Sequence, residues 1–175
     1  KSLPSSIINY INDNYDGYDI GFCEEDNGQY EEIREIGNGC GASMIMKKED
    51  FLKVGGFDEK FFMYYEDTDL SYRIKNILNK RLLYCPNSIV RHIHTGSSVE
   101  WSPFFVYHVN KNKLFFILKN FGFKKFLTHY RSFVKRTLQI IVKCETNKDI
   151  ELAYLKSLIS VTFNIFHYLF HKKRG

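Results

Sequence analysis

Residues 57–70 place acidic and aromatic side chains close together. Glu66 and Asp67 stand where a helical pattern starts, so Asp67 would lie in the first turn, near unsatisfied backbone N–H groups and the positive end of the helix dipole. That position favours the ionised carboxylate, whereas the aromatic neighbours and Glu66 raise its pKa. A carboxylate under these opposing influences can take a proton from an attacking hydroxyl group, and we expect Asp67 to be such a base. The plainer interpretation is that Asp67 or Asp69 only caps the helix.

Two further segments could contribute to a site. His92 and His94 are two positions apart after an apolar stretch, so both would project to one side of an extended chain. Either imidazole could ligate a divalent metal ion, and a structural, hydrogen-bonded role is the alternative. Residues 39–43 are small, which lets a ligand approach the backbone closely, but a tight turn before a strand explains them equally well. They lack the Gly-Lys-Ser/Thr of a phosphate-binding loop.

The element that would position Asp67 is a helix from about residue 66. Its apolar face would consist of Leu70, Ile74, Ile77 and Leu78. Asp69 and Arg73, four residues apart, can form an ion pair on another side. Elsewhere the sequence predicts short helices at 5–15 and 47–52 and strands at 20–23, 42–46, 82–85 and 88–93. It also predicts long helices at about 104–120, 123–143 and 148–171.

Composition places the chain among folded proteins. Hydrophobic residues make up 44% of the 175 positions and aromatic residues 17%, so a sizeable core is expected. The four cysteines, Cys23, Cys40, Cys85 and Cys144, are far apart, which predicts reduced thiols and a cytoplasmic location. No 18-residue apolar run is present, so we expect no segment that spans a bilayer.

Charge divides the chain into two parts near Pro103. Residues 1–103 carry a net charge of −6 and residues 104–175 a net charge of +11, within an overall +5. We therefore predict two domains, 1–103 and 104–175, the second a basic, aromatic helical extension. Its helices could simply pack a core with solvated lysines, or they could attach to an anionic membrane surface. Nucleic-acid binding is not expected, because no recognised motif supports it.

The order of the motifs carries a resemblance to a known family. Gly-Ala-Ser-Met-Ile-Met-Lys-Lys (41–48), Val-Gly-Gly-Phe-Asp-Glu (54–59), the block 61–73, Tyr-Cys-Pro-Asn-Ser-Ile-Val-Arg-His (84–92) and Gly-Ser-Ser (96–98) follow one another. This succession resembles the second half of family 2 glycosyltransferases, which are inverting enzymes of the GT-A fold. It is most similar to rhamnosyltransferase-type enzymes that build bacterial surface polysaccharides. The resemblance covers about residues 37–120, and the block 54–73 is its most specific part.

The resemblance implies a fold and a set of roles. The fold would be α/β: a partial GT-A domain, the C-terminal acceptor-side half, followed by a mainly helical extension. Asp67 would deprotonate the acceptor hydroxyl, with Glu66 beside it to orient the acceptor. Gly41, Ala42 and Ser43 would border the donor sugar and the acceptor, and His92, rather than His94, would complete the coordination of Mg²⁺ or Mn²⁺ on the donor diphosphate. The full enzyme would be a hexosyltransferase that moves a sugar from a nucleoside diphosphate to a glycan or lipid-linked acceptor. It would work in the cytoplasm or at the inner face of the cell membrane.

Two departures from the family pattern shape the expectation. Residues 1–36 lack the alternating strands and helices of a nucleotide-binding half, so we expect this fragment alone to be inactive and to bind no metal ion. Asp67-Thr68-Asp69 matches Asp-x-Asp literally, but its context is acceptor-side, which argues against a donor metal site. The alternative function is a non-catalytic module that binds glycan or a membrane surface. An exposed face where the absent half would dock could also pair with itself and give a homo-oligomer.

Overall fold

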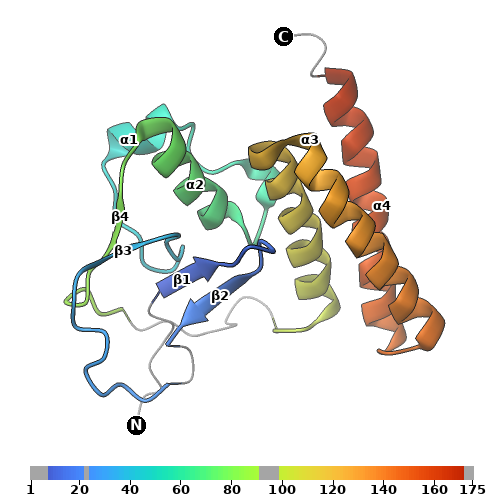
Figure 1. The fold of residues 1–175 in the computed structure, drawn as a ribbon, viewed down its shortest axis with the longest axis horizontal. Coiled ribbons are helices and arrows are strands. Elements are labelled where there is room, and N and C mark those ends of the chain that lie inside the picture. Colours follow the sequence, from blue (N-terminus) through green and yellow to red (C-terminus); the bar gives the residue numbers. More distant parts are fainter. Residues whose placement is uncertain (1–7, 22–23, 91–98, 172–175) are drawn as a thin grey trace. The chain divides into compact units, whose positions relative to one another are not determined.

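The computed structural model describes residues 8–21, 24–90 and 99–171. The chain divides into two compact units, Lys1–His94 and Thr95–Gly175, each of which is treated by itself below. Within the described residues, the first unit is a mixed α/β arrangement with two small antiparallel sheets, and the second is helical (Figure 1). A partial GT-A fold stays a prediction.

The first sheet is a hairpin of β1 (Ile8–Ile11) and β2 (Gly17–Ile20), in which Ile8 pairs with Ile20 and Ile11 with Gly17. The prediction of a helix at 5–15 is therefore wrong for its described part. The reason is the polar turn that follows β1. The Asn12 side-chain oxygen accepts the backbone N–H groups of Asn14 at 2.9 Å and Asp16 at 3.0 Å, which reverses the chain and brings β2 back alongside β1.

The second sheet pairs β3 (Arg34–Ile36) with β4 (Leu82–Tyr84), so that it joins segments far apart in the sequence. The strand predicted at 82–85 is confirmed, whereas β3 was not predicted. The strand predicted at 42–46 does not form. Met44 and Met46 pack on the core and Ile45 between them is fully exposed, an alternation typical of a strand, but no neighbouring strand completes a ladder. No strand covers residues 88–90, and the remainder of that prediction lies outside the described residues.

Two α-helices and a short 3-10 helix, η1 (Glu59–Phe61), complete the described part of the first unit. α1 (Lys48–Lys53) ends before Gly55 and Gly56, and α2 (Glu66–Leu78) ends at Asn79 in the left-handed conformation. Both agree with the sequence. The core of this unit consists of Val54, Leu70 and Ile74, with Met44, Met46, Phe51, Leu78 and Leu82 packed around them. Ile77, which was expected in the apolar face, is 62% exposed.

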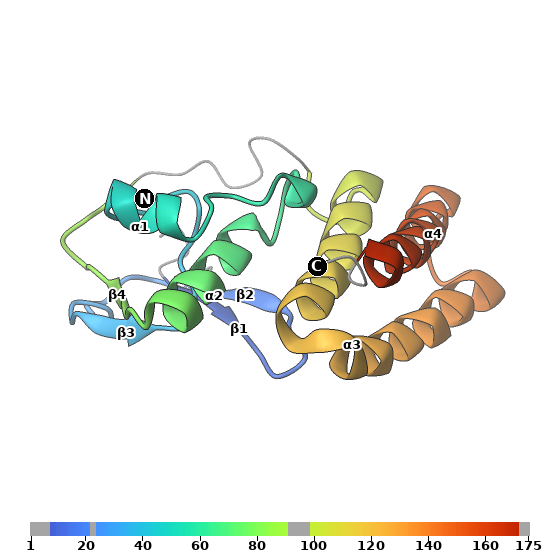
Figure 2. The same ribbon diagram turned by 90° about the horizontal axis from the view of Figure 1, so that it is seen from above.

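The second unit is a bundle of α3 (Pro103–Lys143) and α4 (Lys148–His171). Gly122 has φ 81° and ψ 172°, which interrupts α3 between the two helices that the sequence predicts there. α4 contacts both parts of α3: Ser157 donates a hydrogen bond to the Tyr107 carbonyl at 3.1 Å, and the Tyr130 and Thr162 hydroxyls are 2.7 Å apart (Figures 1 and 2). None of the described helices is long and apolar enough to cross a membrane.

Candidate functional site

The site is built around the first turn of α2, where the chain enters the helix through an unusual backbone. Tyr64 and Tyr65 both lie in the left-handed region, with φ 69° and 70°. This conformation costs a non-glycine residue about 1–2 kcal/mol, so the surrounding packing has to hold it in place. Tyr65 is buried, and its hydroxyl donates a 2.7 Å hydrogen bond to the Tyr15 carbonyl in the turn between β1 and β2. The start of α2 is thus tied to the hairpin.

Asp67 is not the cap of this helix. The N-cap is Tyr65, and no side chain makes a capping hydrogen bond there, so neither Asp67 nor Asp69 has the plain capping role. Instead, Asp67 receives donors on both carboxylate oxygens. Its Oδ2 accepts the Gly41 N–H at 2.9 Å, and its Oδ1 accepts the Thr68 N–H at 2.6 Å and the Thr68 hydroxyl at 3.3 Å. Asp67 itself is half-buried, so solvent still reaches part of it.

The loop that supplies Gly41 is bound along one face of α2. Asn38 donates a side-chain hydrogen bond to the Thr68 hydroxyl at 3.1 Å, and the Gly39 N–H donates to the Ser71 hydroxyl at 3.1 Å. Thr68 and Ser71 are three residues apart and therefore neighbours on the helix surface. Because the Thr68 oxygen accepts from Asn38, its own proton is directed to Asp67. Asn38 is 3% exposed, so this contact is shielded from water.

The backbone of Gly41 lies directly against the Asp67 carboxylate, because glycine has no side chain to separate them. A Cβ at this position would stand 3.4 Å from the Asp67 Oδ2, on the side where the glycine is exposed. Ala42 and Ser43 continue the same exposed turn, which a hydrogen bond from the Ser43 N–H to the Cys40 carbonyl closes at 3.0 Å. The structure therefore brings Gly41 to Asp67 and places Ala42 and Ser43 next along the turn.

Burial governs the electrostatics of the two adjacent carboxylates. It raises the pKa of Asp67, while the donors from Gly41 and Thr68 lower it and the charge of Asp19 raises it. Burial also raises the pKa of Glu66, and the charge of Asp67 adds to that effect. Both carboxyl groups therefore hold protons more strongly than solvent-exposed ones. A raised pKa moves a carboxylate toward the range in which a general base works best at neutral pH.

One oxygen of the Glu66 carboxylate is a buried acceptor that is unsatisfied among the described residues. Its Oε2 is out of contact with solvent and has no hydrogen-bond partner within the residues that the structure describes. Such an atom is costly, because it has lost water without gaining a donor. A hydroxyl group of a bound ligand would satisfy it if the side chain rotated, because the residue as a whole is only half-buried. Glu66 thus remains a candidate for orienting a hydroxylated molecule next to Asp67.

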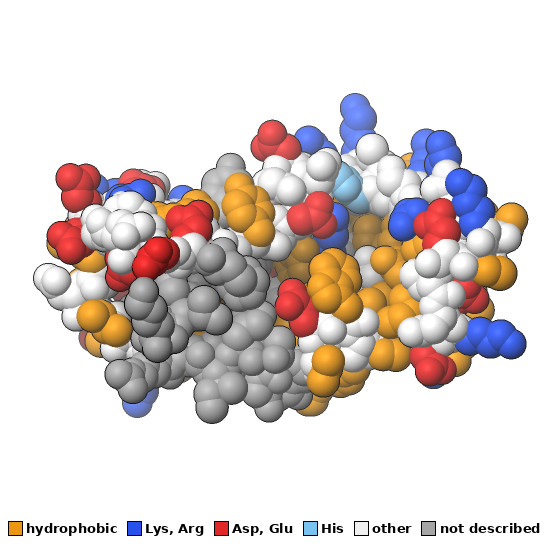
Figure 3. Space-filling model, turned by 90° about the horizontal axis from the view of Figure 1, so that it is seen from below, with side chains coloured by type: hydrophobic (Ala, Val, Ile, Leu, Met, Phe, Trp, Pro, Cys, Tyr) orange, Lys and Arg blue, Asp and Glu red, His pale blue; other side chains and the backbone are white. Residues whose placement is uncertain are grey.

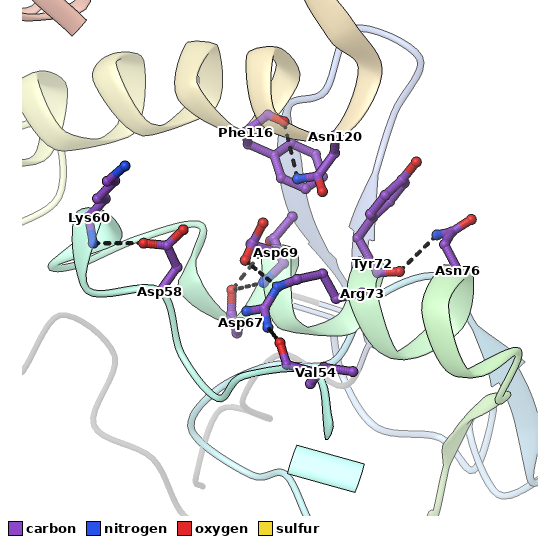
Figure 4. A network of polar contacts seen from close by, with 11 residues as sticks. Val54, Asp58, Lys60, Asp67, Asp69, Tyr72, Arg73, Asn76, Phe116 and Asn120 are labelled. Carbon is purple, nitrogen blue, oxygen red and sulfur yellow. Dashed lines mark hydrogen bonds and ion pairs between the residues drawn. The ribbon is translucent and has the colours of Figure 1, made fainter. Parts of the chain in front are cut away.

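Asp69, the second carboxylate of the literal Asp-x-Asp, is fully buried and already engaged. Its Oδ2 is 2.7 Å from the Arg73 Nε, and Arg73 also donates to the Val54 carbonyl at 2.5 Å (Figure 4). The predicted pair is confirmed, but it forms in the interior. Asp69 therefore anchors α2 to the end of α1 and is not free to join Asp67 on a metal ion.

The described residues do not form a metal centre. No three His, Cys, Asp or Glu side chains come together within residues 8–21, 24–90 and 99–171 as a metal ion would require. His92, the predicted ligand, and His94 lie outside the described residues. The chemistry available from the described part is that of the two carboxylates and the backbone around them.

The sequence alone did not indicate the residues that hold Asp67 and the start of α2 in place. Asn38 and Tyr15 stand 30 and 50 positions away from their partners Thr68 and Tyr65, so no local spacing indicates these contacts. Thr68 lies inside the motif, but its side chain acts on its immediate neighbour. The one local signal was the glycine-dense segment 39–41, whose small residues allow the Asp67 side chain to lie close to the backbone.

Comparisons with known proteins find likenesses over the part of the chain that contains these residues. Residues 24–95 match a family model described as the N-terminal domain of galactosyltransferase. Over 71 residues the chain is 34% identical to Rhamnosyltransferase WbbL of Escherichia coli (strain K12), covering 40% of this chain and 26% of that protein. Over 70 residues it is 37% identical to N-acetylglucosaminyl-diphospho-decaprenol L-rhamnosyltransferase of Mycobacterium tuberculosis (strain CDC 1551 / Oshkosh), covering 40% and 22%. No solved structure matches.

The matched residues, which include the site, are similar in sequence to glycosyltransferases. Among the relatives found, the likeness is to rhamnosyltransferases. The chain spans about a quarter of the length of these relatives. One part of the expectation is corrected: the likeness lies in the N-terminal half of this chain, and the matching model describes an N-terminal domain, not a C-terminal half.

Proposed function

We propose that this chain supplies the acceptor-activating site of an inverting family 2 glycosyltransferase with a GT-A fold. The observation that carries the proposal is the arrangement of donors on Asp67. A carboxylate oxygen accepts about two hydrogen bonds. Oδ1 already has both from Thr68, whereas Oδ2 has only one from the described residues, that of Gly41. Oδ2 therefore retains one accepting position, beside an exposed glycine, and this is the atom that we assign as the base.

The proposed step is a single displacement. An acceptor hydroxyl donates a hydrogen bond to the Asp67 Oδ2 and passes its proton to that oxygen as it attacks the anomeric carbon of the donor sugar. The new glycosidic bond forms as the bond from that carbon to the diphosphate oxygen breaks, and the nucleoside diphosphate leaves with the electron pair. Attack from the face opposite the leaving group inverts the anomeric configuration. Glu66 Oε2 would accept a second hydroxyl of the acceptor and so orient it.

The fixed geometry of the loop supports this role. The hydrogen bonds from Asn38 to Thr68 and from Gly39 to Ser71 hold the loop on α2, so the Asp67 carboxylate cannot rotate freely. A base held in one orientation avoids the entropic cost of reaching the reactive geometry during each turnover. The raised pKa of Asp67 makes its ionised form a stronger base than an exposed aspartate.

The substrates follow from the relatives and remain proposals. One relative's name contains a diphospho-decaprenol and an L-rhamnosyl group. We propose a nucleoside diphosphate sugar as donor and a glycan or lipid-linked acceptor, in the synthesis of a bacterial surface polysaccharide at the inner face of the cell membrane. Mg²⁺ or Mn²⁺ would belong to the complete enzyme, with His92 as one ligand; bound there, the ion would neutralise the departing diphosphate.

Substitution of Asp67 by Asn in the complete gene product tests the proposal. Removing a general base typically lowers the rate by about 10²–10⁴-fold. We expect that loss in sugar transfer to the acceptor, with donor binding unchanged. Asp13→Asn, which neutralises an exposed aspartate of the β1–β2 turn, should leave the rate unaffected. The rate of transfer would be measured by product formation. A rate for Asp67→Asn within about threefold of wild type would refute Asp67 as the base, because loss of a general base lowers the rate by about 10²-fold or more.

The alternative, a non-catalytic module that binds glycan, rests on the unsatisfied Glu66 oxygen alone. It predicts glycan binding by a wild-type protein that transfers no sugar. Binding on a glycan array, together with the transfer assay on the same preparation, separates the two. Turnover that depends on Asp67 excludes the alternative.

A further inference from the structure

The second unit contains a helix with a strongly one-sided charge. Residues 103–143, which form α3, include nine Lys and Arg and no Asp or Glu. A solvent-exposed helix normally intersperses both signs, since pairs of opposite charge three or four residues apart stabilise it. Here repulsion between the cations is left uncompensated within the helix. An anionic partner would remove that repulsion, and the question is where on α3 it would bind.

One face of α3 combines these cations with exposed apolar side chains. Arg131, Lys135, Leu138 and Val142 recur at helical spacing and line a shallow groove of about 450 Å³. Leu138 is 54% exposed and Val142 is 79% exposed, although both are large and apolar. Thr137 and Ile140, which are buried, point elsewhere on the same helix. The face is therefore not the one with which α3 packs in its own unit.

The charge of this face is not cancelled locally. Glu145, just beyond α3, forms an ion pair with Arg136 at 2.7 Å and lies 4.0 Å from Lys143. Glu145 therefore compensates the charges of Arg136 and Lys143 at the end of the helix. Arg131 and Lys135 have no acidic partner in the part of the chain that the structure describes. Figure 3 shows exposed hydrophobic side chains on the right of that view, among Lys and Arg and also Asp and Glu side chains.

We infer that this face of α3, defined by Arg131, Lys135, Leu138 and Val142, binds the surface of a membrane rich in anionic lipids. Cations would contact the lipid headgroups, while Leu138 and Val142 would enter the boundary between headgroups and acyl chains. A nucleic acid would neutralise the cations but would leave the two apolar side chains in water. A membrane surface satisfies both features together. Attachment through this face would be peripheral, with the helix lying on the bilayer surface.

Vesicle flotation of the complete chain tests this inference. Wild type should bind vesicles of phosphatidylcholine that contain about one third phosphatidylglycerol, and it should not bind vesicles of pure phosphatidylcholine. The bound protein should dissociate from the anionic vesicles as added salt screens the charges. A cation close to an anionic surface contributes about fivefold to affinity, so Arg131→Glu/Lys135→Glu should weaken binding by at least about 25-fold. Leu138→Ser/Val142→Ser should weaken it by about tenfold while leaving the salt dependence in place.

The matched control makes the same charge change elsewhere. Lys48→Glu/Lys53→Glu, at exposed positions of α1, should bind the vesicles like wild type, with circular dichroism confirming that every variant folds. Equal loss in this control would show that only net charge matters and would overturn the inference. So would absence of binding by wild type, or equal binding to both kinds of vesicle. A dimer that the α3 variants dissociate without any lipid, seen by light scattering, would instead assign this face to a second copy of the chain.

Discussion

Removal of the Asp69 carboxylate should destabilise the first unit far more than removal of an exposed acid that pairs with the same helix from β3. Asp69 is fully buried, its Oδ2 is 2.7 Å from the Arg73 Nε, and the Arg73 side chain is only 9% exposed. In Asp69→Ala the guanidinium would stay in the interior with the Val54 carbonyl as its remaining described acceptor, since its Nη2 has no partner there. Breaking a buried pair in this way costs about 3–5 kcal/mol. That is a large share of the roughly 5–15 kcal/mol that stabilises a domain.

The control and the rescue are both available in this chain. Glu35 pairs with Lys75 of α2 at 3.8 Å, but its side chain is 49% exposed, so Glu35→Ala should cost about 1 kcal/mol or less. Asp69→Ala/Arg73→Met should recover much of the lost stability, because an apolar side chain of similar length replaces the stranded charge. The free energy of unfolding would be measured in urea, with hydrogen exchange of α2 amides to report on the first unit separately. A loss in Asp69→Ala no greater than in Glu35→Ala, or a double variant no better than the single one, would refute this reasoning.

Two further predictions concern the proposed base. Thr68→Val removes the hydroxyl that donates to Asp67 and accepts from Asn38; we expect a loss of about 1–2 kcal/mol in stability and a higher pKa of Asp67, since the ionised form loses a donor. The acid limb of the pH–rate profile should move to higher pH in Thr68→Val and not in Thr68→Ser, and an unmoved limb would contradict the role of Thr68. Glu66 has a pKa raised by burial and by Asp67, so it binds protons more strongly in the folded protein than in the unfolded chain, where the value is about 4.3. Wild type therefore loses stability as pH rises through the folded pKa of Glu66, and Glu66→Gln removes this contribution while that of Asp67 remains. In thermal unfolding, the Tm of Glu66→Gln relative to that of wild type should rise from about pH 4 upward. A relative rise confined to lower pH would show that the pKa of Glu66 is not raised by folding.

The sequence alone determined the elements whose signals are local. The apolar spacing of Leu70, Ile74 and Leu78 predicted α2, and the long periodic stretches on either side of Gly122 predicted the helices of the second unit. Local signals failed for 5–15, where the sequence pattern favoured a helix but the turn at Asn12 and pairing with β2 produce a strand. They failed again at 42–46, because a strand also needs a neighbour with which to form hydrogen bonds.

The site shows the same division. Residue types and motif order in the sequence identified Asp67, Glu66 and Gly41 as candidates. Only the tertiary structure decided that Gly41 donates to the Asp67 Oδ2, 26 residues away, and that Asp69 forms a buried ion pair with Arg73. The reason is that hydrogen bonds and burial depend on which distant segments pack against one another. Periodicity along the chain reports which face of a helix is apolar, but it carries no information about which backbone N–H will meet a given carboxylate.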